Sequence, residues 1–245
     1  MPIDRRKPMT TKAPIVLAVD TSDLDTAISW VKATADIVSV YKLGLEFFLT
    51  FGSDGVNAIT QNTEADIFLD LKLHDIAHTV AGAAHAVSSL KPKYLTVHAS
   101  GGSEMIRAAA DALPSTLVTG VTILTSLSET DVEGIGFKDN ALDSAVRLAA
   151  LATHAGARAI VCSPLEIVAI RQSVGSDITI ITPGVRPADT EHKDDQARTM
   201  TPREAIDRGA NLVVIGRPIT MSWEKGAQAM RERAIEIAQQ INSVH

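Results

Sequence analysis

A set of charged residues lies where its members could do chemistry together. Asp70 and Lys72 are two positions apart in the segment 70–75, which reads Asp-Leu-Lys-Leu-His-Asp, and Asp20 and Lys42 each end an earlier apolar run. A lysine held between carboxylates keeps its ammonium form, because opposite charges favour that form. Such a lysine is a poor nucleophile, which argues against a Schiff base. It can instead stabilise developing carbanion charge and donate a proton to it.

Eight short runs rich in β-branched residues alternate with helical patterns, and we expect each run to form a strand. The strands are expected at residues 15–20, 37–43, 66–72, 94–98, 117–125, 158–162, 178–182 and 212–216. In the first helical stretch, apolar residues follow the i, i+3, i+4, i+7 pattern from Leu24 to Val31, with Ser22 expected as the N-cap. The last helix repeats this pattern between Ala234 and Ile241.

This alternation predicts an α/β fold in which a parallel sheet closes into an eight-stranded (β/α)8 TIM barrel. An open doubly wound sheet is the alternative, but eight regular units favour closure. Residues 13–245 are expected to form a single catalytic barrel domain, preceded by a flexible N-terminal tail at residues 1–12.

The ends of the first strands bring the charges together. Side chains alternate between the two faces of a strand, and the face that ends in Asp20, Lys42 or Asp70 is otherwise apolar. In TIM barrels the C-terminal edge of the strands carries the active site, so we expect Lys72 and Asp75 to join these residues there. A purely structural ion-pair network is the alternative. Gathering so many charges in one mouth has a large desolvation cost, which favours a role in binding a ligand.

Composition excludes several classes of protein. The formal net charge of −6 disfavours binding to nucleic acid, although a single phosphorylated metabolite needs only a local basic pocket. The one cysteine, Cys162, permits no internal disulfide and suits a cytoplasmic protein. The apolar runs are too short to span a membrane. No cysteine or histidine cluster has the spacing of a metal site, so we expect no metal or other cofactor.

Two glycine–arginine segments follow the last two strands. They are 182–187, Thr-Pro-Gly-Val-Arg-Pro, and 216–218, Gly-Arg-Pro. Barrels commonly bind phosphate at the loops after strands seven and eight. Gly216 would let a phosphate approach the backbone, and Arg217 could hold two of its oxygens. The long polar loop at residues 183–200 is predicted to be a lid, with a solvated insertion as the alternative.

Other polar residues have a weaker claim to function. Thr125 and Ser126 end the fifth expected strand, where a hydroxyl could hydrogen-bond a ligand in the barrel mouth or cap a helix. A histidine in the position of His98 is more often a core residue with satisfied hydrogen bonds than a catalyst. Cys162 lies among apolar residues and is expected to be inert packing.

The segment 70–75 resembles the Asp-x-Lys-x-x-Asp signature of the orotidine 5′-monophosphate decarboxylase suprafamily, and the resemblance extends from Pro14 to the last helix. It implies decarboxylation of orotidine 5′-monophosphate to UMP, with Lys72 as the proton donor at C6 and Asp70 beside the substrate carboxylate. Lys42 and Asp20 would hold the ribose hydroxyls. Asp75 would complete the charge network from the other subunit of a homodimer. The remaining expected substrate contacts are Ile76, Thr79, Thr125, Ser126, Arg186, Gln196, Gly216 and Arg217.

One residue that distinguishes between relatives, one departure from the family pattern and two alternatives bear on this resemblance. The signature is shared by relatives that decarboxylate 3-keto-gulonate 6-phosphate or join formaldehyde to ribulose 5-phosphate. Those relatives are similar to one another in two respects: they use Mg²⁺, and they have a glutamate at the end of strand two. This chain has Lys42 there, which favours the orotidylate enzyme. The family usually has proline after Ile76, where this chain has Ala77. A Mg²⁺-dependent sugar-phosphate enzyme and a non-catalytic nucleotide-binding barrel remain the alternatives.

Overall fold

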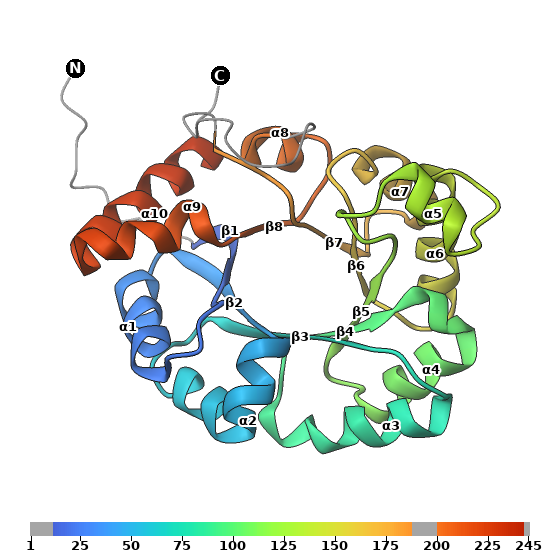
Figure 1. Cartoon of the computed structure of the whole chain (residues 1–245), viewed down its shortest axis with the longest axis horizontal. Helices are drawn as coiled ribbons and strands as arrows, with labels where there is room; N and C mark the ends of the chain where they lie inside the picture. Colours follow the sequence, from blue (N-terminus) through green and yellow to red (C-terminus); the bar gives the residue numbers. More distant parts are fainter. Residues whose placement is uncertain (1–11, 188–199, 243–245) are drawn as a thin grey trace.

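The computed structural model describes residues 12–187 and 200–242, which form a closed barrel of parallel strands in sequential order, β1 to β8. The first and last strands close the ring, with Val16 of β1 paired to Val214 of β8. Figure 1 looks along the barrel and shows the helices outside the ring of strands. The strands are β1 (Ala13–Ala18), β2 (Val38–Gly44), β3 (Asp66–Leu73), β4 (Tyr94–His98), β5 (Leu117–Val121), β6 (Ala159–Val161), β7 (Thr179–Thr182) and β8 (Leu212–Ile215). The predicted TIM barrel is therefore confirmed.

One predicted strand end was wrong by several residues. The fifth strand was expected to run to Thr125, but β5 ends at Val121. Val121 is also the last β5 residue paired with His98 of β4 and with Val161 of β6. Both neighbours end there, so the backbone beyond has no ladder to join, and the chain turns away.

The helices follow the strands around the barrel. They are α1 (Leu24–Thr34), α2 (Leu45–Thr60), α3 (Ala77–Ala86), α4 (Gly102–Ala112), α5 (Glu129–Gly134), α6 (Ala141–His154), α7 (Ile167–Val174), α8 (Pro202–Asp207), α9 (Arg217–Thr220) and α10 (Ala227–Asn242), with short 3-10 helices η1 (Ser88–Leu90), η2 (Ala99–Gly101) and η3 (Met221–Lys225). The N-cap of α1 is Asp23, whose carboxylate accepts the amide of Thr26 at 2.6 Å, and not Ser22 as expected. A carboxylate at this position also meets the positive end of the helix dipole.

Apolar side chains fill the structure in two layers. Inside the barrel, inward-facing residues of the strands pack together, and a larger cluster joins the outer strand faces to the helices. The inner cluster consists of Val16, Val40, Phe68, Tyr94, Ala159, Ile181 and Leu212. Its first three members lie on the strand faces that the sequence pattern assigned to the charged ends, so that assignment is confirmed.

Two predictions fall on parts of the chain that the structure does not describe. Most of the expected N-terminal tail and the expected substrate contact Gln196 lie outside the described residues. At the base of the predicted lid, Val185 pairs with Met200, and the amide of Arg186 donates to the carbonyl of Met200 at 3.0 Å. Within residues 12–187 and 200–242, helices long and apolar enough to span a bilayer are absent.

Candidate active site

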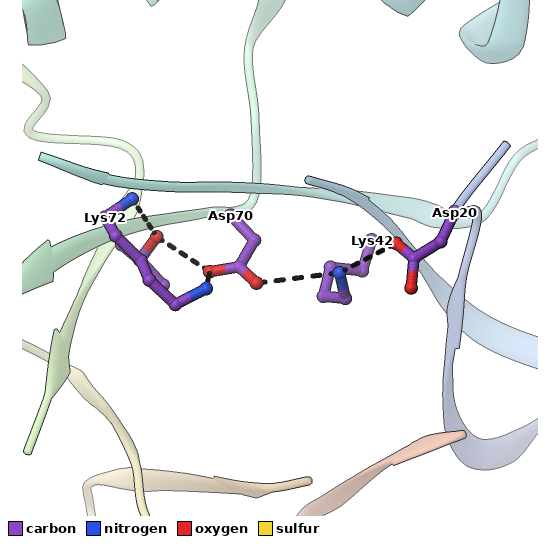
Figure 2. Close-up of polar contacts among 5 residues, drawn as sticks. Asp20, Lys42, Asp70 and Lys72 are labelled. Carbon is purple, nitrogen blue, oxygen red and sulfur yellow. Dashed lines mark hydrogen bonds and ion pairs between the residues drawn. The ribbon is translucent and has the colours of Figure 1, made fainter. Parts of the chain in front are cut away.

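Four charged side chains form a continuous row at the C-terminal ends of β1, β2 and β3. The ammonium of Lys72 is 2.8 Å from Asp70 Oδ1, and the ammonium of Lys42 is 3.6 Å from Asp70 Oδ2. Lys42 Nζ also lies 3.3 Å from Asp20 Oδ1. Figure 2 shows the resulting order, with Asp70 between the two lysines and Asp20 at one end. Positive and negative groups therefore alternate along the row, and each charge lies beside an opposite one.

Strand register explains why these residues meet. β1, β2 and β3 are neighbours, and Lys42 pairs in register with Ala18 of β1 while Gly44 pairs with Asp70 of β3. Gly44 keeps the space beside Lys42 open. A Cβ atom at Gly44 would lie 3.3 Å from Lys42 Nζ, tighter than an ordinary contact. The glycine therefore lets the ammonium approach the backbone closely as it reaches Asp20.

The backbone leaves regular strand geometry at Lys72, which has a φ of 47°. Residues other than glycine rarely adopt this left-handed conformation, and it has an energetic cost. The pairing of β3 with β4 is also irregular here. Leu69 pairs with Leu95, and the next pair is Leu73 with Val97. Four steps along β3 thus face two along β4, so β3 bulges at the two residues that carry the charges.

A buried threonine on β4 supports this bulge. Thr96 is fully buried, and its Oγ1 accepts the backbone amide of Lys72 at 2.8 Å. The same hydroxyl donates to Asp70 Oδ1 at 3.0 Å. Side-chain alternation along its strand puts Thr96 on the same face as Tyr94 but indicates no role for it. Its contacts depend on a bulge in the neighbouring strand, which periodicity along a single strand does not reveal.

The pKa of Asp70 lies below its usual range. Burial is the largest single influence and acts to raise the pKa, but the ammonium groups of Lys42 and Lys72 and the hydrogen bonds from Lys72 and Thr96 together outweigh it. Only 13% of the Asp70 side chain is exposed, so little water screens these interactions. The carboxylate is therefore held in its ionised form at neutral pH.

Asp75 does not join the row within this chain. The structure places Asp75 and Ile76 on an exposed turn after β3 and Thr79 in the first turn of α3, also exposed, and Ile76 is 70% exposed. Asp75 Oδ1 accepts the amide of Ile76 at 2.6 Å. Ile76 is the N-cap of α3 with φ −60° and ψ 154°, and Ala77 is the first helical residue. Proline is favoured at the first position of a helix, so the proline that the family usually has in place of Ala77 would fit there.

A second titratable pair borders the row. The rings of His74 and His98 have centroids 5.4 Å apart. The pKa of His98 is lowered, first by burial and then by the nearby charges of His74 and Lys72, with Asp70 acting in the opposite direction. His98 is thus a half-buried histidine held neutral beside the charged residues.

The residues expected at the phosphate end lie after β7 and β8. Gly216 is the N-cap of α9, and Arg217 and Pro218 are the first two residues of this helix. Arg217 is exposed, and Arg186 is partly buried with its guanidinium donating to the carbonyl of Val185 at 3.0 Å. A Cβ atom at Gly216 would lie 3.3 Å from Ala18 Cβ, so packing against β1 also favours glycine here.

Thr125 and Ser126 lie on an exposed turn beyond the end of β5. Neither caps α5, because the N-cap of that helix is Ser128, which forms a capping box with Asp131. Cys162 follows β6 and is a fully buried free thiol whose pKa is raised, chiefly by burial. The prediction that Cys162 is buried packing is confirmed.

A buried glutamate at the mouth was missed by sequence analysis. Glu166 follows β6 and is 6% exposed, and its Oε2 accepts the amide of Ser163 at 2.9 Å. The spacing Ser163-x-x-Glu166 is that of a capping box before α7, which was the available signal. Among the described residues, His, Cys, Asp and Glu side chains nowhere gather in threes as a set of metal ligands.

Comparisons with known proteins identify the family of the chain. Residues 13–232 match the family described as "Orotidine 5'-phosphate decarboxylase / HUMPS family". The orotidine 5'-phosphate decarboxylase of Thermobifida fusca is 52% identical over 217 residues, covering 89% of this chain and 93% of that protein. The one from Frankia casuarinae is 44% identical over 242 residues, covering 92% and 88%. A crystal structure of the Lactobacillus acidophilus enzyme is 33% identical with a TM-score of 0.79, covering 95% of this chain and all 100% of that one.

Proposed function

The chain belongs to the orotidine 5'-phosphate decarboxylase family, and on that premise we propose that it converts orotidine 5′-monophosphate to UMP and CO₂. The observation that carries this function is the ion-pair row at the barrel mouth. Lys42 of this row stands at the position where the Mg²⁺-using relatives have an acidic residue. An ammonium there repels a divalent cation and attracts the anionic, hydroxylated substrate.

The reaction would proceed through a carbanion at C6 of the pyrimidine. The bond between C6 and the carboxylate carbon breaks, CO₂ leaves, and the electron pair stays on C6. The ammonium of Lys72 then donates a proton to C6, and solvent reprotonates the amine. Asp70 holds Lys72 Nζ at 2.8 Å and keeps its own negative charge, which stabilises the ammonium and repels the substrate carboxylate.

Substrate contacts would divide between the two halves of the mouth. Asp20 and Lys42 would hold the ribose hydroxyls at the ends of β1 and β2. The phosphate would lie at Gly216 and Arg217, with Arg186 and Gln196 contributing from the loop that closes over it. Thr125 or Ser126 would hydrogen-bond the pyrimidine edge from the exposed turn after β5.

Full turnover should survive exhaustive chelation, because Lys42 and Lys72 supply the positive charge that a metal supplies elsewhere. The test is to treat the protein with EDTA, remove it, add orotidine 5′-monophosphate and follow the loss of its absorbance as UMP forms. Activity that disappears with EDTA and returns with Mg²⁺ would indicate the sugar-phosphate chemistry of the metal-using relatives. Binding of UMP without any turnover would indicate a nucleotide-binding barrel.

We further propose that two chains form a dimer with shared sites. Asp75 and Ile76 lie on the exposed turn after β3, and Thr79 is exposed in the first turn of α3. Large apolar side chains are exposed as well, with Ile76 70%, Leu45 48% and Leu49 79% exposed. A two-fold partner would cover these residues and bring its Asp75 to the row of this chain.

The shared site can be tested by complementation. Lys72→Ala and Asp75→Ala are each expected to be nearly inactive when pure. After they are unfolded together and refolded, half of the dimers are mixed, and each mixed dimer has one site with both residues intact. About a quarter of all sites should therefore recover. If Asp75 acts within its own chain, activity stays at the mutant level, and a monomer on sedimentation would end the proposal.

A cytoplasmic location is also proposed. The single cysteine of the chain, Cys162, is a free buried thiol. Proteins of reducing compartments typically keep their cysteines in this form. Fractionation of cells that express the protein would test the location.

A further inference from the structure

The hydroxyl of Thr96 uses both of its hydrogen-bonding roles inside the row. It accepts the amide of Lys72 at 2.8 Å and donates to Asp70 Oδ1 at 3.0 Å. A hydroxyl has one proton to donate, and Thr96 donates it to Asp70. A lone pair of the same oxygen accepts the backbone amide of Lys72. Thr96 is 0% exposed, so water does not compete for either bond.

These two bonds hold the parts of β3 that depart from strand geometry. Lys72 has the left-handed φ of 47°, and its amide has left the β3–β4 ladder at the bulge. The side-chain oxygen of Thr96 replaces the backbone acceptor that the regular ladder would provide. Such a strained conformation persists only where its surroundings hold it. Asp70 Oδ1 then receives two donors from different strands, the ammonium of Lys72 and the hydroxyl of Thr96.

We propose that Thr96 is a positioning residue for the decarboxylation, holding the Lys72 backbone and the Asp70 carboxylate so that the ammonium points to the reacting carbon. This inference rests on the proposed function. Thr96 acts through Lys72 and Asp70, and its contribution is to the orientation of the proton donor. Binding of substrate depends mainly on the phosphate and ribose contacts, so the loss of Thr96 should lower kcat while leaving affinity nearly intact.

The barrel contains a matched control one strand away. Thr119 of β5 pairs in register with Thr96 and is also 0% exposed. Its hydroxyl donates to the carbonyl of Leu117 at 2.8 Å and not to a charged residue of the row. Thr119→Val therefore makes the same chemical change at the same depth of the barrel, without touching the row.

The experiment compares Thr96→Val, Thr96→Ser and Thr119→Val by kcat, KM for orotidine 5′-monophosphate and the Kd of UMP. Valine has the shape of threonine without the hydroxyl, and we expect kcat to fall about 10- to 100-fold, as loss of a hydrogen bond to a charged group implies. KM and the Kd of UMP should stay within about threefold, because the phosphate contacts are unchanged. Serine keeps the hydroxyl and should restore kcat to within about threefold of wild type.

Three results would overturn the positioning role. They are a kcat for Thr96→Val close to wild type, a Thr96→Ser variant as slow as the valine variant, and a Thr119→Val variant that is equally slow. If Thr96→Val does not fold, Thr96→Ala removes the same hydroxyl without adding a methyl group and takes its place. Wild-type protein that does not turn over orotidine 5′-monophosphate refutes the proposed function itself. If wild type is active and Thr96→Val has an unchanged kcat, only this inference is refuted.

Discussion

Two buried carboxyl groups at the C-terminal side of the barrel differ in the direction of their pKa shifts. Asp70, at the end of β3, has a lowered pKa, although burial is the largest single influence on it and acts upward. Glu166, after β6, has its pKa raised to about 7, chiefly by burial, with a further rise from Glu129 and an opposing hydrogen bond from Ser163. Both lie near or after the ends of barrel strands and have little exposure, with 13% of the Asp70 side chain and 6% of Glu166 exposed.

The difference lies in their neighbours. Asp70 contacts the ammonium groups of Lys42 and Lys72, whereas Glu166 forms no ion pair with a cation in the part of the chain that the structure describes. Burial alone therefore disfavours the charged form. At Asp70 two cations, together with the hydrogen bonds from Lys72 and Thr96, reverse that effect. The β1–β4 half of the mouth carries a set of fixed charges, and the β6 region carries a carboxyl group that can titrate near neutral pH.

The largest expected effect comes from removing the cation nearest Asp70. Lys72→Ala should lower kcat by about 10²–10⁴-fold, the contribution expected of a general acid. The Kd of UMP should change much less, because the phosphate contacts lie elsewhere. Lys93→Ala is the control, since Lys93 is exposed and precedes β4 at the opposite end of the barrel. Near-normal turnover by Lys72→Ala would refute its role as proton donor.

Asp70→Asn should destabilise the protein as well as inactivate it. The change leaves two ammonium groups without their shared carboxylate and should cost about 1–3 kcal/mol at pH 7, less than for a fully buried pair. Because the folded pKa of Asp70 is lowered, its contribution to stability is present above the unfolded value and lost as pH falls through the folded pKa. The destabilisation should therefore shrink towards acidic pH in denaturant titrations.

The control for this change is Asp66→Asn. Asp66 begins the same strand, is exposed, and lies at the opposite end of the barrel. It should show no comparable loss. If Asp70→Asn and wild type have the same free energy of unfolding at pH 7, the ion pairs of the row do not stabilise the fold.

Arg217→Ala probes the other half of the mouth. A charge-assisted phosphate contact contributes roughly 1.5–3 kcal/mol, so kcat/KM for orotidine 5′-monophosphate should fall by about 10- to 100-fold. Turnover of orotidine, which lacks the phosphate, should change little. Arg208→Ala is the matched control, because Arg208 is exposed at the opposite end of β8. Equal losses on both substrates would place Arg217 away from the phosphate.

The smallest effect, and one of opposite sign, is expected for Glu166→Gln. The folded pKa of Glu166 is raised, so its contribution to stability is present below the unfolded value of 4.5 and is lost as pH rises through about 7. Glutamine stays neutral and should stabilise the protein relative to wild type by about 1–2 kcal/mol at pH 8 but not at pH 4.5. For a chain of this size, each kcal/mol should raise Tm by about 2–4 °C.

Exposed Glu64 provides the control for the pH dependence. Glu64→Gln should lack the gain in Tm at pH 8 that is expected for Glu166→Gln. If Glu166→Gln lowers Tm at pH 8, an uncharged side chain does not satisfy this site, and the contrast with Asp70 would not be one of charge.

The sequence alone determined the architecture and most of the charged row. The eight strands, their inward faces and the family were predicted because side-chain alternation and motif spacing are local properties of the chain. The same alternation brought Asp20, Lys42, Asp70 and Lys72 to one end of the barrel. Strand and helix ends were less well predicted, as at β5 and at the N-cap of α1, because they depend on where neighbouring elements stop.

Only the tertiary structure decided how these groups act on one another. The left-handed turn at Lys72 and its bond to Thr96 arise from a bulge between two strands, and the pKa values of Asp70 and Glu166 depend on burial and on residues distant in sequence. Asp75 shows the same limit, because the motif includes it, while in the structure it is exposed and its carboxylate accepts the amide of Ile76. Periodicity predicts which face of a strand a residue lies on. Its contacts depend on the register between neighbouring strands and on burial, and these contacts determine its protonation state.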